Sequence, residues 1–129
     1  MEKPLNLSSI ISLLEKSSIV SKIEKVEIDE ISHRGFYKIK CNLIPAKYKL
    51  EMKFIKTKYE FIYSFQLFTT LPVVRWDNAP HYPDIKTFPH HFHDSEGNIV
   101  ESELEGNARN DLKKVLSKIT ELISRSKYL

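Results

Sequence analysis

The feature that most constrains the fold is an alternation of apolar and mostly polar residues between Tyr48 and Leu67. A period of two places successive side chains on opposite faces of a strand, so the alternation predicts strands with one apolar face. A polar break at 56–58 divides the run and predicts a long hairpin. The apolar positions are Tyr48, Leu50, Met52 and Phe54 before the break and Tyr59, Phe61, Tyr63, Phe65 and Leu67 after it.

Shorter runs of the same kind flank this hairpin. A strand around Val26 is followed by a turn at 33–35, and a second strand covers Tyr37–Leu43. A fifth strand is expected over Leu71–Trp76. Because all of these connections are short, they favour an antiparallel meander of about five strands over a parallel sheet.

Helical spacing of apolar residues appears near both ends of the chain. Leu7–Val20 predicts a short amphipathic helix, with Asn6 or Ser8 as its cap, and Asn107–Ser126 predicts the longest helix. We therefore expect an α+β fold in which the long C-terminal helix and the short N-terminal helix pack on one face of the sheet. A length of 129 residues suits one domain, covering residues 1–129.

The amino-acid composition predicts where in the cell the protein is located. The chain has no apolar run approaching the ~20 residues that cross a bilayer, and its N-terminal segment lacks a cleavage site for export. A single cysteine, Cys41, excludes an intramolecular disulfide. The expected location is therefore the cytoplasm, without a membrane. The formal charge of +3 permits contact with nucleic acid but does not require it.

The segment Asp77–Glu105 has little periodicity. Structureless loops of that length are uncommon in compact domains and tend to be functional or disordered. Several aromatic anchors and three prolines favour an ordered loop here. Within it, Ile99–Val100 is expected to form a short extra strand.

Four of the five histidines lie in this loop, at positions 81, 90, 91 and 93. Histidine transfers protons near neutral pH, and a nearby arginine can stabilise charge on a phosphoryl group. The set is sufficient for metal-free cleavage of a phosphodiester. The candidate catalytic residues are His81, His90, His91, His93 and Asp77, and the candidate substrate-binding residues are Arg75, Trp76, Asn78 and Tyr82.

Other interpretations of the same residues stay open. In a structural one, Trp76 fills the end of the sheet, Asp77 or Asn78 forms an Asx turn, and Arg75 pairs with a carboxylate. In a metal-binding one, His91 and His93 project to the same side of an extended segment and bind a transition metal with His81 or Asp84. No CxxC or HExxH frame supports the metal, so the leading interpretation uses no metal and no cofactor.

Two surfaces outside the histidines also have alternative interpretations. The lysines at 38, 40, 49 and 53, partly offset by Glu51, predict either a solvated sheet face or a groove for a phosphate backbone. The loop aromatics Trp76, Tyr82 and Phe92 could instead anchor a protein partner in a non-catalytic binding module. An exposed edge strand could support a homodimer.

The stretch RWDNAPHYPDIKTFPHHFH, residues 75–93, followed by GNIVES, resembles the signature of the TumE-like proteins. The family pattern reads approximately RWDNAPHHP, a short spacer, then TFPHHxH. The resemblance covers roughly Phe36–Ile119, and this long motif is quite specific. Tyr82 stands where the family commonly has a second histidine, which leaves His81, His90, His91 and His93 as the candidates.

TumE-like proteins are small prokaryotic toxins of toxin–antitoxin systems. The resemblance therefore implies a toxin held in check by a cognate antitoxin, often a DNA-binding protein. It implies no particular reaction. Small toxins commonly arrest growth by cleaving RNA, so the leading hypothesis is a histidine-dependent ribonuclease. In that hypothesis His81 and His90 or His91 exchange protons, Arg75 holds a phosphate and Asp77 orients a histidine.

Overall fold

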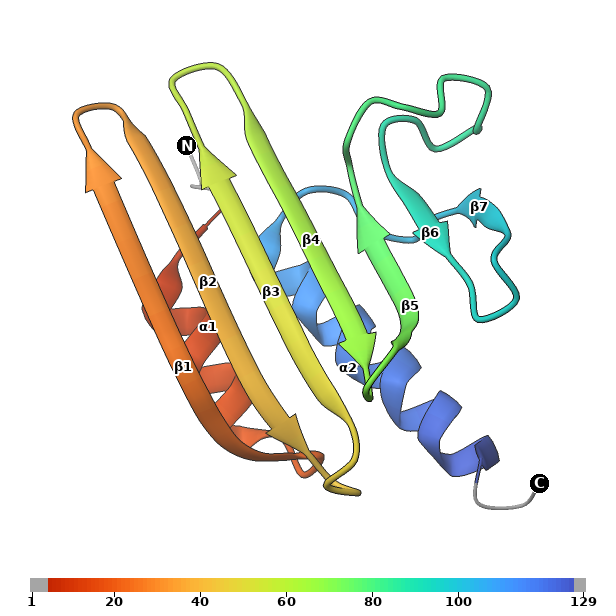
Figure 1. The fold of residues 1–129 in the computed structure, drawn as a ribbon. Coiled ribbons are helices and arrows are strands. Elements are labelled where there is room, and N and C mark those ends of the chain that lie inside the picture. Colours follow the sequence, from red (N-terminus) through yellow and green to blue (C-terminus); the bar gives the residue numbers. More distant parts are fainter. Residues whose placement is uncertain (1–4, 127–129) are drawn as a thin grey trace.

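A computed structural model describes residues 5–126 of the chain. Within that range two helices and seven strands follow one another in the order α1, β1 to β7, α2 (Figure 1). The bounds are α1 Leu7–Lys16, β1 Val20–Ile31, β2 Arg34–Leu43, β3 Lys49–Lys56, β4 Phe61–Phe68, β5 Pro72–Asp77, β6 His91–His93, β7 Ile99–Glu101 and α2 Ala108–Ser126.

The strands form one antiparallel sheet in which each strand pairs with the next in the chain. The predicted α+β meander is therefore confirmed, but the described residues form seven strands rather than about five. The extra strand expected at Ile99–Val100 is β7, and β6 is the strand that the alternation did not reveal. A three-residue strand such as β6 is too short to show a recognisable period.

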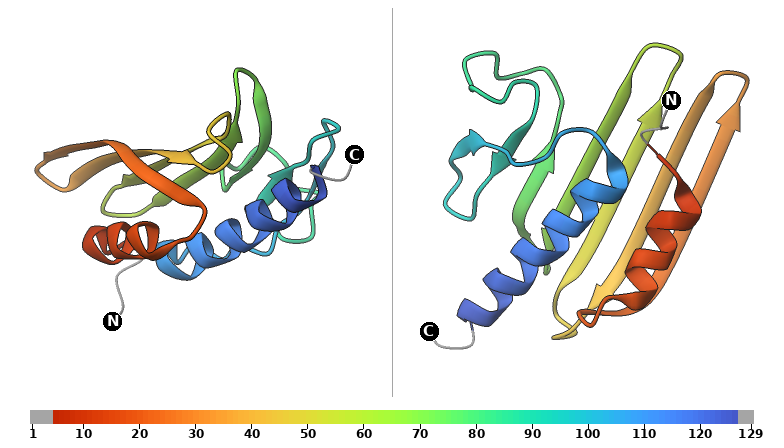
Figure 2. Two further views of the ribbon diagram at one scale, coloured as in Figure 1. Left: turned by 90° about the horizontal axis from the view of Figure 1, so that it is seen from below. Right: turned by 180° about the vertical axis from the view of Figure 1, so that it is seen from behind.

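Both described helices lie on the same face of the sheet (Figure 2). The alternating apolar residues of the long hairpin point toward them: Leu50, Met52, Phe54, Tyr63, Phe65 and Leu67 are all buried. The helices contribute Ile10, Leu14, Leu112, Val115 and Ile119 to the same core. The opposite face of β2 to β5 carries the polar members of the alternation.

The N-terminal helix is shorter than its sequence pattern indicates. Asn6 caps α1, because its side-chain oxygen accepts from the Ser9 amide, as one of the two expected caps. The helix ends at Lys16, and Ser17 adopts an extended conformation. Val20, expected in the helix, instead begins β1. Residues such as Val20 and Ile23 fit either period, and pairing with β2 favours the strand.

Cys41 provides a probe of this core. It lies in β2 and is fully buried, and this burial raises the pKa of the thiol to about 12. Because the thiolate is the reactive form, we expect the folded protein to resist a thiol-specific reagent near neutral pH. The unfolded protein should react at once. Labelling followed by mass spectrometry, with and without denaturant, measures the difference, and rapid labelling of the folded chain would contradict this packing.

Among the described residues, neither helix is long and apolar enough to cross a membrane.

Candidate functional site

The pairing of β5 with β6 brings the polar side chains of the histidine-rich segment together. Asp77 pairs with His91 and Arg75 pairs with His93. Residues directly opposite each other in an antiparallel pair project to the same face, so all four side chains lie on one face. This is the face away from both described helices. The sequence prediction that His91 and His93 project to the same side is confirmed.

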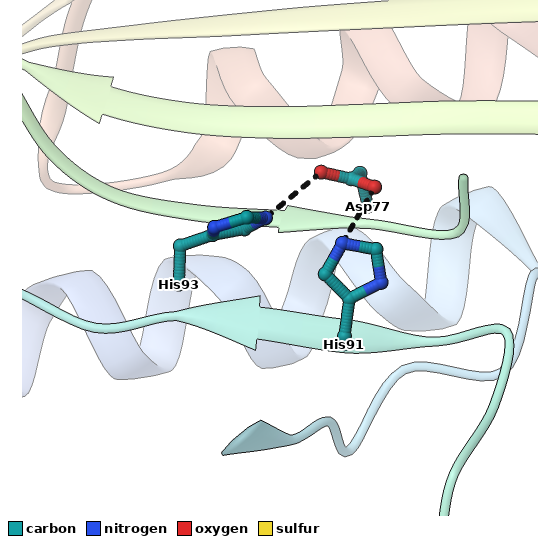
Figure 3. Close-up of side chains that lie close together, drawn as sticks. All are labelled: Asp77, His91 and His93. Atoms are coloured by element: carbon teal, nitrogen blue, oxygen red, sulfur yellow. Dashed lines mark ion pairs between the residues drawn. The ribbon is translucent and has the colours of Figure 1, made fainter. Parts of the chain in front are cut away.

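Asp77 is the centre of this group, which we call the Asp77 cluster: Asp77, His91, His93 and Arg75. His91 Nε2 lies 2.9 Å from Asp77 Oδ1, and His93 Nε2 lies 3.4 Å from Oδ2 (Figure 3). Arg75 Nε also donates to Oδ2, at 2.9 Å. The Ala79 amide donates to Oδ1 at 3.0 Å, which forms the predicted Asx turn. The buried carboxylate thus faces three basic side chains.

His91 is held at both ring nitrogens. Its Nε2 faces Asp77, and its Nδ1 lies 3.0 Å from the carbonyl oxygen of Pro89. Its side chain is only 2% exposed, and the Tyr82 ring stands edge-on to it with ring centroids 4.7 Å apart. His91 is therefore positioned by its surroundings and hidden from solvent.

His93 is the accessible histidine of the cluster. Its side chain is 31% exposed, and only Nε2 has a hydrogen-bonding partner among the described residues. Burial lowers the pKa of His93, while the charge of Asp77 acts in the opposite direction and those of His91 and Arg75 add to the lowering. A neutral ring with Nε2–H directed to Asp77 leaves a free lone pair on Nδ1. That atom can accept a proton from a bound molecule.

Cationic groups lie beside these histidines. Arg75 uses Nε for Asp77, and its side chain is 46% exposed, which leaves the terminal nitrogens accessible. A shallow pocket of about 150 Å³ lies beside the cluster, lined by Arg75, Asp77, Ser64 and Lys53 and by the apolar side chains of Ile55, Ile62 and Ala79. Arg75 and Lys53 are the cationic groups that border it.

The lysines predicted from the sequence lie on this same face of the sheet, but most are paired. Glu51 contacts both Lys38, at 3.7 Å, and Lys53, at 3.6 Å. Lys49 pairs with Glu24 at 3.5 Å. The remaining one, Lys40, lies over the Phe68 ring. The face is therefore of mixed charge, and the two cations that border the cluster, Lys53 and Arg75, are each paired with a carboxylate.

His90 is separated from the cluster by the sheet. Its Nδ1 lies 2.7 Å from the Tyr63 hydroxyl, its ring stacks on the Tyr63 ring, and it lies close to Gly106. Burial raises the pKa of Tyr63 and lowers that of His90. The tyrosine therefore keeps its proton and donates to a neutral His90. This arrangement gives His90 a packing role on the helix side.

The segment that carries His90 is fixed by contacts that the sequence did not reveal. Thr87 Oγ1 donates to the His90 carbonyl at 2.7 Å and accepts from the Ser102 amide at 3.0 Å. Asp111, near the start of α2, accepts from the amides of Glu105 and Gly106. Gly106 has a φ of +93°, which favours glycine. Single hydroxyl and carboxylate side chains carry no spacing signal, so no pattern could have found them.

The remaining candidates divide between structural and exposed positions. The Asn78 amide accepts from the Tyr63 amide and donates to the Phe61 carbonyl, so it extends the pairing of β5 with β4. Trp76 packs on Phe92 on the helix side, with ring centroids 4.9 Å apart. His81 is exposed in the loop, beside Tyr82.

These positions bear on the other interpretations of the loop. Trp76 is 5% exposed and packs on the half-buried Phe92, and both rings line a pocket of about 250 Å³ on the helix side of the sheet, away from the Asp77 cluster. Asp84 is exposed and does not join the histidines, and the carboxylate beside His91 and His93 is Asp77. The predicted pairing of Arg75 with a carboxylate is confirmed, again through Asp77.

The sheet, the two helices on one face and the histidine–carboxylate–arginine cluster define a class: small α+β proteins with a polar centre where β5 pairs with β6. A family model described as Toxin TumE matches residues 10–123, and the chain belongs to this toxin family. No curated protein and no solved structure matches the chain. Membership of a toxin family implies a cognate antitoxin as partner.

Proposed function

We propose that this toxin cleaves RNA, with the Asp77 cluster as its catalytic centre. The observation that carries the proposal is the convergence of two imidazoles and a guanidinium on one buried carboxylate, at the face of the sheet opposite the two described helices (Figure 2). RNA carries its own nucleophile, the 2′-hydroxyl group. Its cleavage therefore requires only groups that move protons and cations that stabilise the phosphate.

His93 is the base in this mechanism. Asp77 holds its Nε2–H, and Nδ1 accepts the proton of the 2′-hydroxyl as the oxygen attacks phosphorus. A lowered pKa keeps the ring neutral near pH 7, which is the form a base needs. His91 keeps Asp77 in place from the other side. This division of roles resembles that of hydrolase triads, in which a buried carboxylate orients the histidine.

The phosphate is bound by cations at the neighbouring pocket. The terminal nitrogens of Arg75 and the ammonium of Lys53 stabilise the additional negative charge of the transition state. The departing 5′ oxygen takes a proton from His81, which lies beside Tyr82 on the exposed loop. The products are a 2′,3′-cyclic phosphate and a free 5′-hydroxyl group.

The proposed partner is an antitoxin that binds DNA and covers this face of the toxin. Such a partner would block access of RNA to His93 and Arg75. A homodimer would form at the edge of β1, the first strand of the described sheet, because its outer backbone groups are available for a further strand.

The proposal is tested by cleavage of single-stranded RNA by the purified protein. His93→Ala should reduce the cleavage rate by about 10³-fold or more, since it removes the base. His33→Ala is the matched control, because His33 is exposed in the turn between β1 and β2, outside the cluster. Circular dichroism checks that both variants fold.

Growth of bacteria that express each variant gives a second readout. Wild type and His33→Ala should arrest growth and degrade RNA, and His93→Ala should do neither. Cleavage by His93→Ala at the wild-type rate would rule out this base, and intact RNA during growth arrest by the wild type would rule out a ribonuclease.

A further inference from the structure

The three side chains around Asp77 have the composition of a metal site. One donor atom from each of Asp77, His91 and His93 can be chosen so that all three lie within 4.8 Å of one another. Imidazole and carboxylate groups are common ligands of Zn²⁺ and of other divalent transition metals. From these donors we propose that Asp77, His91 and His93 bind one Zn²⁺ ion, through the carboxylate and the two Nε2 atoms.

The distances are close to those that an ion would require. Zinc binds imidazole nitrogen and carboxylate oxygen at about 2.0–2.2 Å, so two tetrahedral ligands stand roughly 3.3 Å apart. His93 Nε2 is 3.4 Å from Asp77 Oδ2, and His91 Nε2 is 2.9 Å from Oδ1, so each imidazole faces its own carboxylate oxygen. Binding of one ion therefore requires the three donor atoms, now within 4.8 Å of one another, to draw together around it. Three protein ligands leave the fourth position for water or substrate.

The surroundings of His91 support this site independently. Metal-bound histidines almost always direct their other ring nitrogen to a carbonyl or carboxylate, which fixes the tautomer. His91 Nδ1 lies 3.0 Å from the Pro89 carbonyl oxygen, and the opposite ring nitrogen, Nε2, is directed at Asp77 Oδ1 at 2.9 Å. The backbone carbonyl thus occupies the outer position of the ring and leaves Nε2 as the nitrogen that an ion beside Asp77 would contact.

Arg75 should weaken the binding of zinc to Asp77. Its guanidinium donates to Asp77 Oδ2, so its positive charge lies beside the proposed ion and occupies one lone pair of the carboxylate. Because the Arg75 side chain is half-exposed, it can move away when the ion binds. The two cations therefore compete for Asp77, and removal of the guanidinium should strengthen zinc binding.

Zinc binding also has a consequence that rests on the proposed ribonuclease function. A neutral His93 that binds zinc through Nε2 carries its single ring proton on Nδ1. That nitrogen then has no lone pair to accept the proton of the 2′-hydroxyl. Zinc at this site should therefore stop the metal-free cleavage, and a chelator should restore it. No redox step or further reactant is involved, because the ring proton moves from one nitrogen to the other through solvent.

Binding is measured by isothermal titration calorimetry of the chelator-treated full chain with ZnCl₂. We expect one ion per chain, with no comparable binding of Mg²⁺, which prefers oxygen ligands. His93→Gln should weaken binding by at least about 100-fold, His33→Ala should leave it unchanged, and Arg75→Gln should strengthen it. Co²⁺ provides a spectroscopic check, because a four-coordinate site with nitrogen ligands gives intense visible bands.

His91→Gln tests the buried ligand, and thermal unfolding shows whether this variant folds. Failure to bind one Zn²⁺ per chain, or equal affinity in wild type and His93→Gln, would overturn the site. Zinc binding and RNA cleavage are tested independently of each other, because the calorimetric titration contains no RNA. If zinc binds and RNA cleavage requires it, the metal site is supported and metal-free cleavage is refuted. If zinc binds but the protein cleaves no RNA under any condition, the metal site alone is supported.

Discussion

Asp77→Ala is expected to reduce RNA cleavage by about 10³-fold and to lower the free energy of unfolding by about 3 kcal/mol. Asp77 is 5% exposed, accepts from Arg75 and from the Ala79 amide, and lies 2.9 and 3.4 Å from ring nitrogens of His91 and His93. Without the carboxylate, His91 remains buried with an unsatisfied nitrogen, which is the costly outcome when one member of a buried pair is removed. His93 loses the group that orients its ring.

Asp77→Asn separates these two effects. The amide has nearly the same shape and can still accept from the Ala79 amide, so most of the stability should remain. It carries no charge, and its NH₂ group cannot accept from Arg75 or His93. Cleavage should therefore be lost while the melting temperature stays close to that of the wild type. Thermal unfolding and the RNA assay, measured on the same samples, check both values, and active Asp77→Ala would remove Asp77 from the mechanism.

The fold could be predicted from the sequence wherever a strand was long enough to show its period. β2 to β5 were found because their apolar residues alternate over six or more positions, and α2 because its apolar stripe continues from Leu112 to Ile123, about three turns. β6 has only three residues, and its place in the sheet depends on pairing with Asp77 and its neighbours. Tertiary pairing of that kind leaves no local pattern.

The sequence located the segment that carries the candidate site, but only the pairing of the strands shows which of its side chains lie together. Adjacent residues of a strand project to opposite faces, so His90 and His91 must separate once β6 forms. The sequence hypothesis allowed either of them to exchange protons with His81. In the structure, His90 packs on Tyr63 on the helix side, and His91 joins Asp77 on the other. The strand register, which the sequence left open, determines which histidines can act together.

The same alternation determines the role of Trp76. Its neighbours Arg75 and Asp77 face the site, so the indole faces the helices and packs on Phe92. Trp76 was expected to bind substrate, but this position allows no contact with a molecule bound at Arg75. Its contribution to activity should instead come through β6, because the contact with Phe92 holds that short strand against β5.

Trp76→Ala should therefore lower the free energy of unfolding by about 3–5 kcal/mol, the range found when a large buried aromatic side chain is truncated. Trp76→Phe keeps an apolar ring against Phe92 and should lose roughly half as much, with RNA cleavage per folded molecule close to the wild-type rate. Urea unfolding followed by circular dichroism measures the first effect, and the RNA assay the second. A stable Trp76→Phe variant that binds RNA far more weakly than wild type would show that the indole contacts the substrate. That contact would require β5 to be shifted by one residue, so that Trp76 faced the Asp77 cluster.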